Sequence, residues 1–365
     1  MKFPLDIPGL SALQQLHHLP YPSKPEGLAI PEWLFEASLS AWTPAAVGVA
    51  YLVSTHATNT RFGNGKPKPA DLVKDSYFLS QAVLAHNILL AVFSGWTFVN
   101  VAAILAGYFG KAAYSHGTQG LVNAYCTVPV HDASIGGMGI YVWLFYASKY
   151  YEIVDSIILI LKGKPVSNLQ SYHHAGAMAC MWAAYRYSAS AVFIFLLFNS
   201  LVHTLMYTYY SMTALKLPFT GGLKRSMTTI QITQLVVGVQ LAASYLFIRF
   251  QPFSYPSGSL PSPGRTLPDP SWSGSASSKL FNSAYESNST ATADLLDHHS
   301  IRSSGGGGEQ TPCVSTTGQF FAVLLNVIYL LPLIYLFVSF YIRSYRKSAA
   351  GRAGKAGGSK GSKAL

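Results

Sequence analysis

Residues 191–212, AVFIFLLFNSLVHTLMYTYYSM, indicate the class of this protein. The stretch is predominantly apolar over about 20 residues, which is the length of helix that crosses ~30 Å of hydrocarbon. Within it, Asn199, His203, Tyr207 and Tyr210 recur at helical spacing and form one polar line down an apolar helix. Polar side chains inside a membrane helix are costly and are functional candidates by default. The stretch therefore predicts a membrane helix with one polar face.

The rest of the chain repeats the apolar pattern. Half of the 365 residues are hydrophobic and only 11% are charged, whereas a soluble domain carries about 25% charged residues. We expect an all-α polytopic membrane protein with seven transmembrane helices. The apolar runs are approximately 35–54, 84–108, 136–161, 171–190, 191–212, 228–249 and 318–342.

Lys and Arg set the predicted orientation. The loops after the first, third and fifth runs, together with the tail, hold 16 of the 25 basic residues. Basic loops stay cytosolic, so we expect a luminal N-terminus and a cytosolic C-terminus. This distribution also argues against nucleic acid as a partner. The predicted parts are 1–34 (luminal segment), 35–250 (helices one to six), 251–317 (insertion), 318–342 (helix seven) and 343–365 (basic cytosolic tail).

The insertion at 251–317 is rich in Ser, Pro and Gly. Such a composition cannot bury enough apolar surface to offset its ordering entropy. We expect a disordered luminal segment. It contains one sequon at Asn288, a candidate for glycosylation.

The third run carries a group of polar residues in SKYYEIVDS. Lys149, Glu152 and Ser156 share one helix face, and Asp155 flanks it. One interpretation is an internally paired ion cluster that fixes helix packing. The other is a polar mouth at the cytosolic end that binds a charged substrate or orients a base.

Two further groups lie on the fourth and sixth runs. In LQSYHHAGA, Gln170 faces His173 at i,i+3 and His174 at i,i+4. Thr228, Gln231 and Gln234 follow at three-residue spacing, which is typical of polar contacts between membrane helices. Both groups have a structural interpretation and a functional one. His86 and Asn87 in the second run are further candidates for the same cavity.

Three classes of protein could use these histidines. A di-iron desaturase needs many imidazoles, but no HxxxH box occurs and only His86, His173, His174 and His203 lie in spans. A receptor or lipid transporter would explain a polar cavity but not the cytosolic His pair. Acyl chemistry fits better, because imidazole is a good nucleophile toward thioesters near neutral pH.

Four boxes give the chain a family resemblance. KYYEIVDS resembles the KxxExxDT box of the ELO family of very-long-chain fatty acid elongases, with Ser156 in place of Thr, and QSYHH resembles its HxxHH box, with Gln170 in place of the first His. NSLVHTLMYTYY is similar to its NxxxHxxMYxYY box and TTIQITQ to its TxxQxxQ box. The QxxHH version resembles a subset of elongases, among them algal enzymes that act on polyunsaturated chains.

The resemblance implies a reaction and a fold. The family condenses a long-chain acyl-CoA with malonyl-CoA in the endoplasmic reticulum membrane, releasing CO2 and CoA and leaving a 3-oxoacyl-CoA. Six of its seven helices form a barrel around an acyl tunnel. No cofactor and no metal are expected. Expected partners are the two CoA substrates, membrane lipid, and the ketoreductase, dehydratase and enoyl reductase of the cycle. The oligomeric state stays open, with a homodimer as one option.

The resemblance also assigns roles. His173 would form an acyl-imidazole, His203 would polarise the malonyl unit or handle its proton, and His174 would support them. The residues expected to bind substrate are Lys149, Glu152, Asp155, Gln170, Asn199, Tyr207, Tyr210, Gln231 and Gln234. From the topology alone, four basic residues would meet the CoA phosphates: Lys162, Lys164, Lys224 and Arg225.

The three cysteines receive separate predictions. Cys126 and Cys313 are both luminal in the predicted topology, and the oxidising lumen favours a disulfide between them. Cys180 lies in a span and is expected to be an inert apolar residue. The dilysine signal of the family is only partial, because Lys363 has no second lysine at the required spacing.

Overall fold

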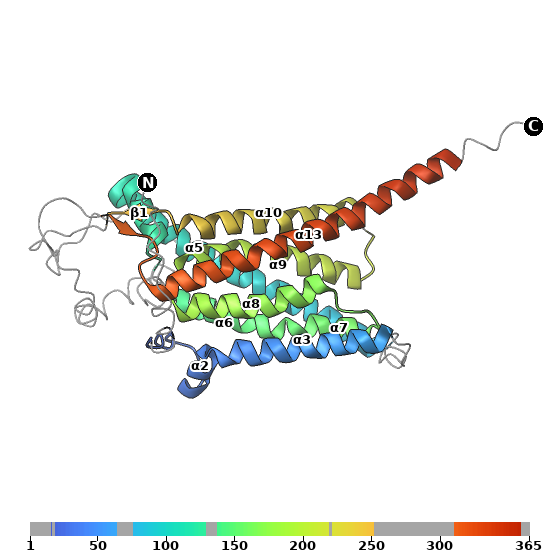
Figure 1. Ribbon diagram of the computed structural model, residues 1–365, viewed down its shortest axis with the longest axis horizontal. Helices are drawn as coiled ribbons and strands as arrows, with labels where there is room; N and C mark the ends of the chain where they lie inside the picture. Colours follow the sequence, from blue (N-terminus) through green and yellow to red (C-terminus); the bar gives the residue numbers. More distant parts are fainter. Residues whose placement is uncertain are drawn as a thin grey trace, which may run out of the picture.

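The computed structural model describes residues 16, 19–63, 76–128, 137–218, 221–251 and 310–358. Long helices run along a common axis (Figure 1). The elements are α2 (Glu32–Leu39), α3 (Trp42–Gly63), α5 (Tyr77–Cys126), α6 (Met138–Tyr151), α7 (Ile153–Leu161), α8 (Asn168–Arg186), α9 (Ser190–Ala214), α10 (Gly221–Ser244), β1 (Arg249–Phe250), β2 (Thr311–Pro312) and α13 (Thr317–Gly358).

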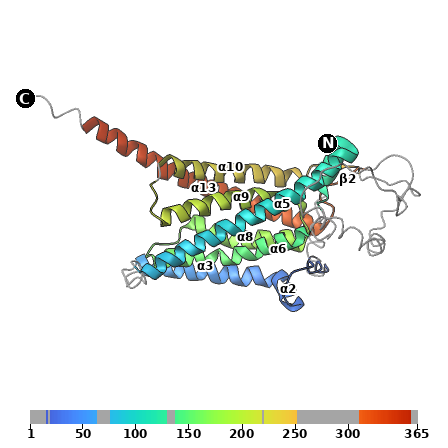
Figure 2. The same cartoon turned by 180° about the vertical axis from the view of Figure 1, so that it is seen from behind.

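Six helices pack in a closed ring. α5 contacts α9, α9 contacts α10, α10 contacts α13, α13 contacts α8, α8 contacts α6, and α6 returns to α5. Helix α3 lies outside this ring against α8, and α5 crosses the back of the bundle obliquely (Figure 2). The ring agrees with the six-helix barrel that the resemblance implies.

The described helices differ in how well each suits a bilayer. By length and apolar composition, α5, α9 and the 317–345 part of α13 qualify as membrane spans, and the pair α2–α3, bent by 64°, qualifies as a fourth. Helices α8 and α10 carry several of the polar residues predicted to be functional, which lowers their apolar content. The chain is an all-α polytopic membrane protein, and the count of seven spans stays a prediction.

Several helix ends differ from the apolar runs. Helix α3 continues to Gly63 and α13 to Gly358, past the expected ends at 54 and 342. Helix α5 continues to Cys126 through a break at Gly117, which has φ +56°. Glycine adopts this conformation without a steric penalty, so the chain changes direction there. A single residue, Glu152, separates α6 from α7.

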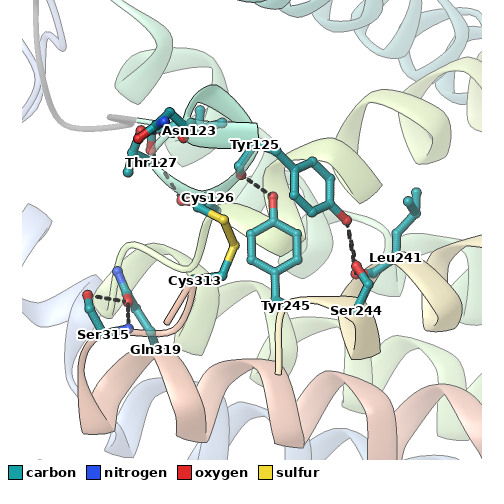
Figure 3. The surroundings of a disulfide bond; sticks show 12 residues. Asn123, Tyr125, Cys126, Thr127, Leu241, Ser244, Tyr245, Cys313, Ser315 and Gln319 are labelled. Atoms are coloured by element: carbon teal, nitrogen blue, oxygen red, sulfur yellow. Dashed lines mark hydrogen bonds between the residues drawn. A yellow bond between two sulfur atoms is a disulfide. The ribbon is translucent and has the colours of Figure 1, made fainter. Parts of the chain in front are cut away.

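A disulfide cross-links the chain at one end of the ring, and we call this end of the ring the disulfide end. Cys126 and Cys313, the pair expected from the topology, form a disulfide, and β1 pairs antiparallel with β2 beside it. Next to the disulfide, the Tyr245 hydroxyl donates to the main-chain oxygen of Tyr125 at 2.5 Å (Figure 3). The expected disorder is therefore wrong for residues 310–317, because pairing and the disulfide fix them. Residues 252–309, Asn288 included, lie outside the described residues.

The other end of the ring holds the ends of α7 and α9 and the starts of α8 and α10. We call it the basic end, since it carries Lys162, Lys164, Lys216, Lys224 and Arg225. The helix pair α8–α9 turns back at the disulfide end through only three residues, 187–189, with Ser188 at φ +50°. The turn is short because the apolar runs 171–190 and 191–212 directly follow one another.

Candidate functional site

A cavity of about 610 Å³ lies inside the ring. That volume is within the range of small-molecule sites, roughly 300–1,000 Å³. Polar residues from α5, α7, α8, α9 and α10 and from the α6–α7 break line it. The predicted residues on its wall are Glu152, Asp155, Gln170, His173, His174, Asn199, His203, Tyr207, Tyr210, Thr228, Gln231 and Gln234. Asn87 lines the same cavity, so the structure brings together predicted residues that lie up to 147 positions apart, from Asn87 to Gln234.

A second, smaller cavity adjoins the first. Its volume is about 30 Å³, and His173, Asn199 and Leu235 line both. The other lining residues are mostly apolar, with Lys149 as the charged exception. The free thiol of Cys180 is also on this wall and is buried, as its expected apolar role requires.

Three imidazoles converge on one buried carboxylate. The ring centroid of His173 lies 5.4 Å from that of His174 and 6.4 Å from that of His203. Glu152 Oε1 is 3.7 Å from His203 Nδ1, and Oε2 is 4.0 Å from His174 Nδ1. The Nζ of Lys149 lies 2.6 Å from Glu152 Oε1, which places an ammonium beside the carboxylate. Because a single residue separates α6 from α7, Glu152 projects into the cavity at the level of the histidines.

Some buried polar atoms at this cavity make no hydrogen bond to the described residues. They are Glu152 Oε2, His203 Nδ1 and Gln234 Nε2. A buried polar atom without a hydrogen bond costs about 1–3 kcal/mol. Such atoms on a cavity wall are available to the polar groups of a ligand.

Asp155 has a different role from Glu152. Its Oδ2 accepts a hydrogen bond from the Tyr207 hydroxyl at 2.7 Å, and its Oδ1 lies 2.9 Å from His86 Nε2. The other nitrogen of His86 lies 3.2 Å from the Tyr151 hydroxyl. The carboxylate therefore ties α5, α7 and α9 together at the cavity wall. His86 belongs to the site through Asp155, while its neighbour Asn87 lines the cavity directly.

Gln170 does not make the contact that its spacing predicts. Its Nε2 donates to Ser156 Oγ at 3.1 Å, and Ser156 Oγ lies 2.8 Å from the Tyr51 hydroxyl. Gln170 lines the cavity, but its side-chain hydrogen bond within the described part of the chain goes to α7. A role for Gln170 in orienting His173 stays a prediction.

The site also contains a candidate set of metal ligands. Three possible ligand atoms lie within 4.8 Å of one another: a carboxylate oxygen of Glu152 and one ring nitrogen each of His173 and His203. A carboxylate with two imidazoles is a common donor set for zinc or iron. Here the Lys149 ammonium at 2.6 Å already occupies the carboxylate and would repel a cation. The absence of a metal remains a prediction.

Basic residues line the cavity at the basic end of the ring. Lys162 and Lys224 line it at the basic end. Burial lowers the pKa of Lys162 below its usual value, and the nearby charge of Lys164 lowers that pKa further. Arg225, also predicted to meet phosphates, donates from Nε to the Tyr341 hydroxyl at 2.7 Å. Within the described residues, the lining thus includes two of the four predicted basic groups.

Two residues at the site were not predicted from the sequence. Tyr329 of α13 contacts His173, and Tyr51 of α3 contacts Ser156. Each is one tyrosine in an apolar run, a pattern more typical of membrane interfaces. Only the packing of α13 against α8, and of α3 against α7, reveals them.

Comparison with known proteins gives matches over much of the chain. The model of the ELO family, described as the GNS1/SUR4 family, matches residues 37–353. Long chain fatty acid elongase 1 of Caenorhabditis elegans is 32% identical over 151 residues, 40% of this chain and 52% of that protein. Fatty acid elongase 2 of Trypanosoma brucei brucei is 34% identical over 151 residues, 39% of this chain and 54% of that protein.

A longer match has lower identity. Long chain fatty acid elongase 2 of C. elegans is 28% identical over 220 residues, 59% of this chain and 73% of that protein. The chain spans about half the length of the first two relatives.

Proposed function

Since the chain belongs to the ELO (GNS1/SUR4) family, we propose that it is a fatty acid elongase. In this proposal it condenses a long-chain acyl-CoA with malonyl-CoA to a 3-oxoacyl-CoA that is two carbons longer. The relatives that carry the name elongase support the substrate class. The proposal rests most directly on His173 and His203, which face one another across 6.4 Å on the wall of a cavity with basic residues at one end.

The first half of the reaction transfers the acyl group to the protein. A nitrogen of His173 attacks the thioester carbon, the C–S bond breaks, and CoA leaves as a thiolate. The product is an acyl-imidazolium, whose positive charge balances the departing thiolate. A proton from solvent at the basic end converts the thiolate to CoA. Imidazole is suited to this step because it is nucleophilic when neutral and a good leaving group when acylated.

The second half forms the carbon–carbon bond. Malonyl-CoA loses CO2, and the electron pair of the broken bond remains as a thioester enolate. The enolate carbon attacks the acyl carbon, and neutral His173 leaves. His203 and Asn199 stand on the wall where that negative charge would develop, and polar groups fixed there would stabilise it. Gln234 adds an unpartnered Nε2 donor on the same wall.

Charge and polarity along the cavity match the two parts of an acyl-CoA. Lys162 and Lys224 at the basic end suit phosphate groups, which lysine binds as a point charge. Beyond the histidines, the lining of the second cavity is mostly apolar, but its volume of about 30 Å³ is far smaller than a long acyl chain, so the side chains around it would have to move to admit one. The acyl chain would enter from the basic end and lead toward the disulfide end.

The cellular setting is part of the same proposal. The basic end would face the cytosol and the disulfide end the lumen of the endoplasmic reticulum, following the distribution of Lys and Arg. The 3-oxo product would pass to the ketoreductase, dehydratase and enoyl reductase of the cycle. The condensation itself requires a nucleophile, proton transfer and enolate stabilisation, and we propose that it proceeds without a cofactor.

The test uses purified full-length protein in detergent. Wild type, His173→Ala and the control His56→Ala are incubated with labelled malonyl-CoA and a panel of acyl-CoAs. His56 is exposed on α3, outside the cavity, and controls for loss of a histidine. We expect labelled 3-oxoacyl-CoA from wild type and His56→Ala and none from His173→Ala. A folded wild type that makes no product with any acyl-CoA would contradict the proposal and favour a transport or receptor role.

A further inference from the structure

The hydroxyl of Tyr329 lies between two atoms of His173. It is 2.9 Å from the ring nitrogen Nδ1 and donates to the main-chain oxygen of the same residue at 3.1 Å. The two residues are 156 positions apart, on α8 and α13. Tyr329 is only 8% exposed, so water does not compete freely for these contacts.

The number of protons determines the direction of both hydrogen bonds. A tyrosine hydroxyl carries one proton, and a main-chain carbonyl can only accept. When the hydroxyl donates to the carbonyl, its oxygen can only accept at Nδ1. Nδ1 must then carry the proton of the neutral imidazole, and Nε2 carries the lone pair. The reverse arrangement would leave two oxygen lone pairs facing each other across 3.1 Å.

The surrounding residues hold Tyr329 in this place. The ring of Tyr172 stacks on the Tyr329 ring with centroids 5.5 Å apart, and its hydroxyl donates to the main-chain oxygen of Tyr329 at 3.1 Å. Gly176, one turn after His173, leaves the space that the Tyr329 ring fills, because a Cβ there would overlap that ring. Space and stacking thus fix the hydroxyl independently of His173.

The other ring nitrogen is left for the cavity. Among the described residues, the hydrogen bond of the His173 ring is the one at Nδ1. His173 also lines both cavities and faces His203. The nitrogen with the lone pair is therefore the one that remains for a substrate.

We propose that Tyr329 is a positioning residue that holds His173 as the Nδ1–H tautomer and thereby makes Nε2 the nucleophile. This inference deepens the proposed function and rests on it. When Nε2 bonds to the acyl carbon and the C–S bond breaks, Nδ1 keeps its proton. The positive charge that develops on the ring is then stabilised by the Tyr329 oxygen. When the enolate displaces the ring, His173 returns to the same tautomer with no further proton transfer.

The experiment compares Tyr329→Phe with Tyr172→Phe. Each variant removes one hydroxyl between the same two helices and keeps the ring stack, but only Tyr329→Phe removes the partner of Nδ1. Acyl-CoA is supplied without malonyl-CoA, and the burst of CoA release reports acylation alone. We expect the acylation rate of Tyr329→Phe to fall about 10- to 100-fold, as for other oriented histidines. Tyr172→Phe should stay within about threefold of wild type, because it keeps the ring stack and the space at Gly176 that fix the Tyr329 hydroxyl.

A second measurement is independent of turnover. Full-length protein with 15N-labelled histidine, wild type and Tyr329→Phe, is compared by NMR, with His173→Gln to assign the signal. We expect the Nδ1–H form for His173 in wild type and a mixture of tautomers in Tyr329→Phe. Unchanged acylation together with an unchanged tautomer in Tyr329→Phe would overturn the inference. A wild type with the Nδ1–H form but no condensation product would instead contradict the proposed function.

Discussion

Lys149 Nζ lies 2.6 Å from Glu152 Oε1, and each side chain is only 3% exposed. The pair is thus buried at the centre of the histidine cluster, where a charge without a partner is costly. Its geometry agrees with an internally paired ion cluster, and a role in binding a charged substrate or orienting a base stays a prediction. Mutation can separate the two.

The first prediction concerns this pair. Lys149→Met and Glu152→Gln should each destabilise the protein by about 3–5 kcal/mol, because each leaves one charge buried and unpaired. The double variant removes both charges and should recover much of that loss. Thermal unfolding of the four proteins in the same detergent gives the coupling between the two sites. If the pair serves the reaction, the double variant stays inactive; recovery of activity with stability would assign the pair to packing alone.

The second prediction concerns Asp155. Asp155→Asn keeps the size of the side chain but removes the carboxylate shared by His86 and Tyr207. We expect kcat for condensation to fall about 100-fold, in the range of groups that hold or transfer protons at an active site. Tyr151→Phe is the control, because it removes a hydroxyl from the far side of His86, on a residue that is 40% exposed. An equal fall in kcat in both variants would show that the hydrogen bonds holding His86 between the helices matter more than the charge of the Asp155 carboxylate.

The third prediction concerns pH and the basic end of the cavity. A phosphate group binds Lys162 only while the lysine is protonated, and burial lowers the pKa of Lys162. Affinity for acyl-CoA should therefore weaken as the pH rises through that lowered pKa, below the range where an ordinary lysine loses its proton. Lys162→Arg should remove this alkaline loss, because arginine stays charged.

The charge itself can be tested at constant pH. Lys162→Ala should raise KM for acyl-CoA about tenfold, the effect of one charged hydrogen bond. Arg61→Ala removes an exposed charge from α3, outside the cavity, and should change KM by less than about twofold. A KM for Lys162→Ala that equals that of wild type at low salt would argue against phosphate contact at this lysine.

The fourth prediction concerns the disulfide. The bond between Cys126 and Cys313 spans 187 positions, and loss of a native disulfide typically costs about 2–5 kcal/mol. The double Cys→Ser variant should unfold at a lower temperature, yet keep its activity in the cold, because neither cysteine lines the cavity. Reductant should lower the unfolding temperature of wild type and leave that of the double variant unchanged. If reductant leaves the unfolding temperature of wild type unchanged, and wild type unfolds at the same temperature as the double variant, the bond is not formed.

The fifth prediction concerns metal. EDTA and 1,10-phenanthroline should leave condensation unchanged, because the Lys149 ammonium holds the carboxylate of the Glu152, His173 and His203 set. Activity that chelators abolish and one divalent cation restores would instead assign these three residues to a metal site. Metal analysis of the purified protein provides the matching stoichiometry.

The sequence by itself determined that this is a membrane protein built of helices, and it determined most of the polar residues that line the cavity. Apolar runs predict membrane helices because their length matches the bilayer, and helical spacing places Asn199, His203 and Tyr207 on one face. Both inferences hold within single helices, where the 3.6-residue period fixes which side chains lie together. The cysteine pairing was also accessible, because it follows from which side of the membrane each loop occupies.

The tertiary structure decided which faces meet. In the folded chain, Asp155 contacts His86, Gln170 donates a hydrogen bond to Ser156, and the Tyr329 hydroxyl contacts the ring of His173. No spacing along one helix predicts such contacts, because they depend on how each helix rotates about its axis and packs on its neighbours. The space left by Gly176 for the Tyr329 ring shows this directly. The sequence supplied an imidazole, and only the packing of α8 against α13 selects the nitrogen that is free to react.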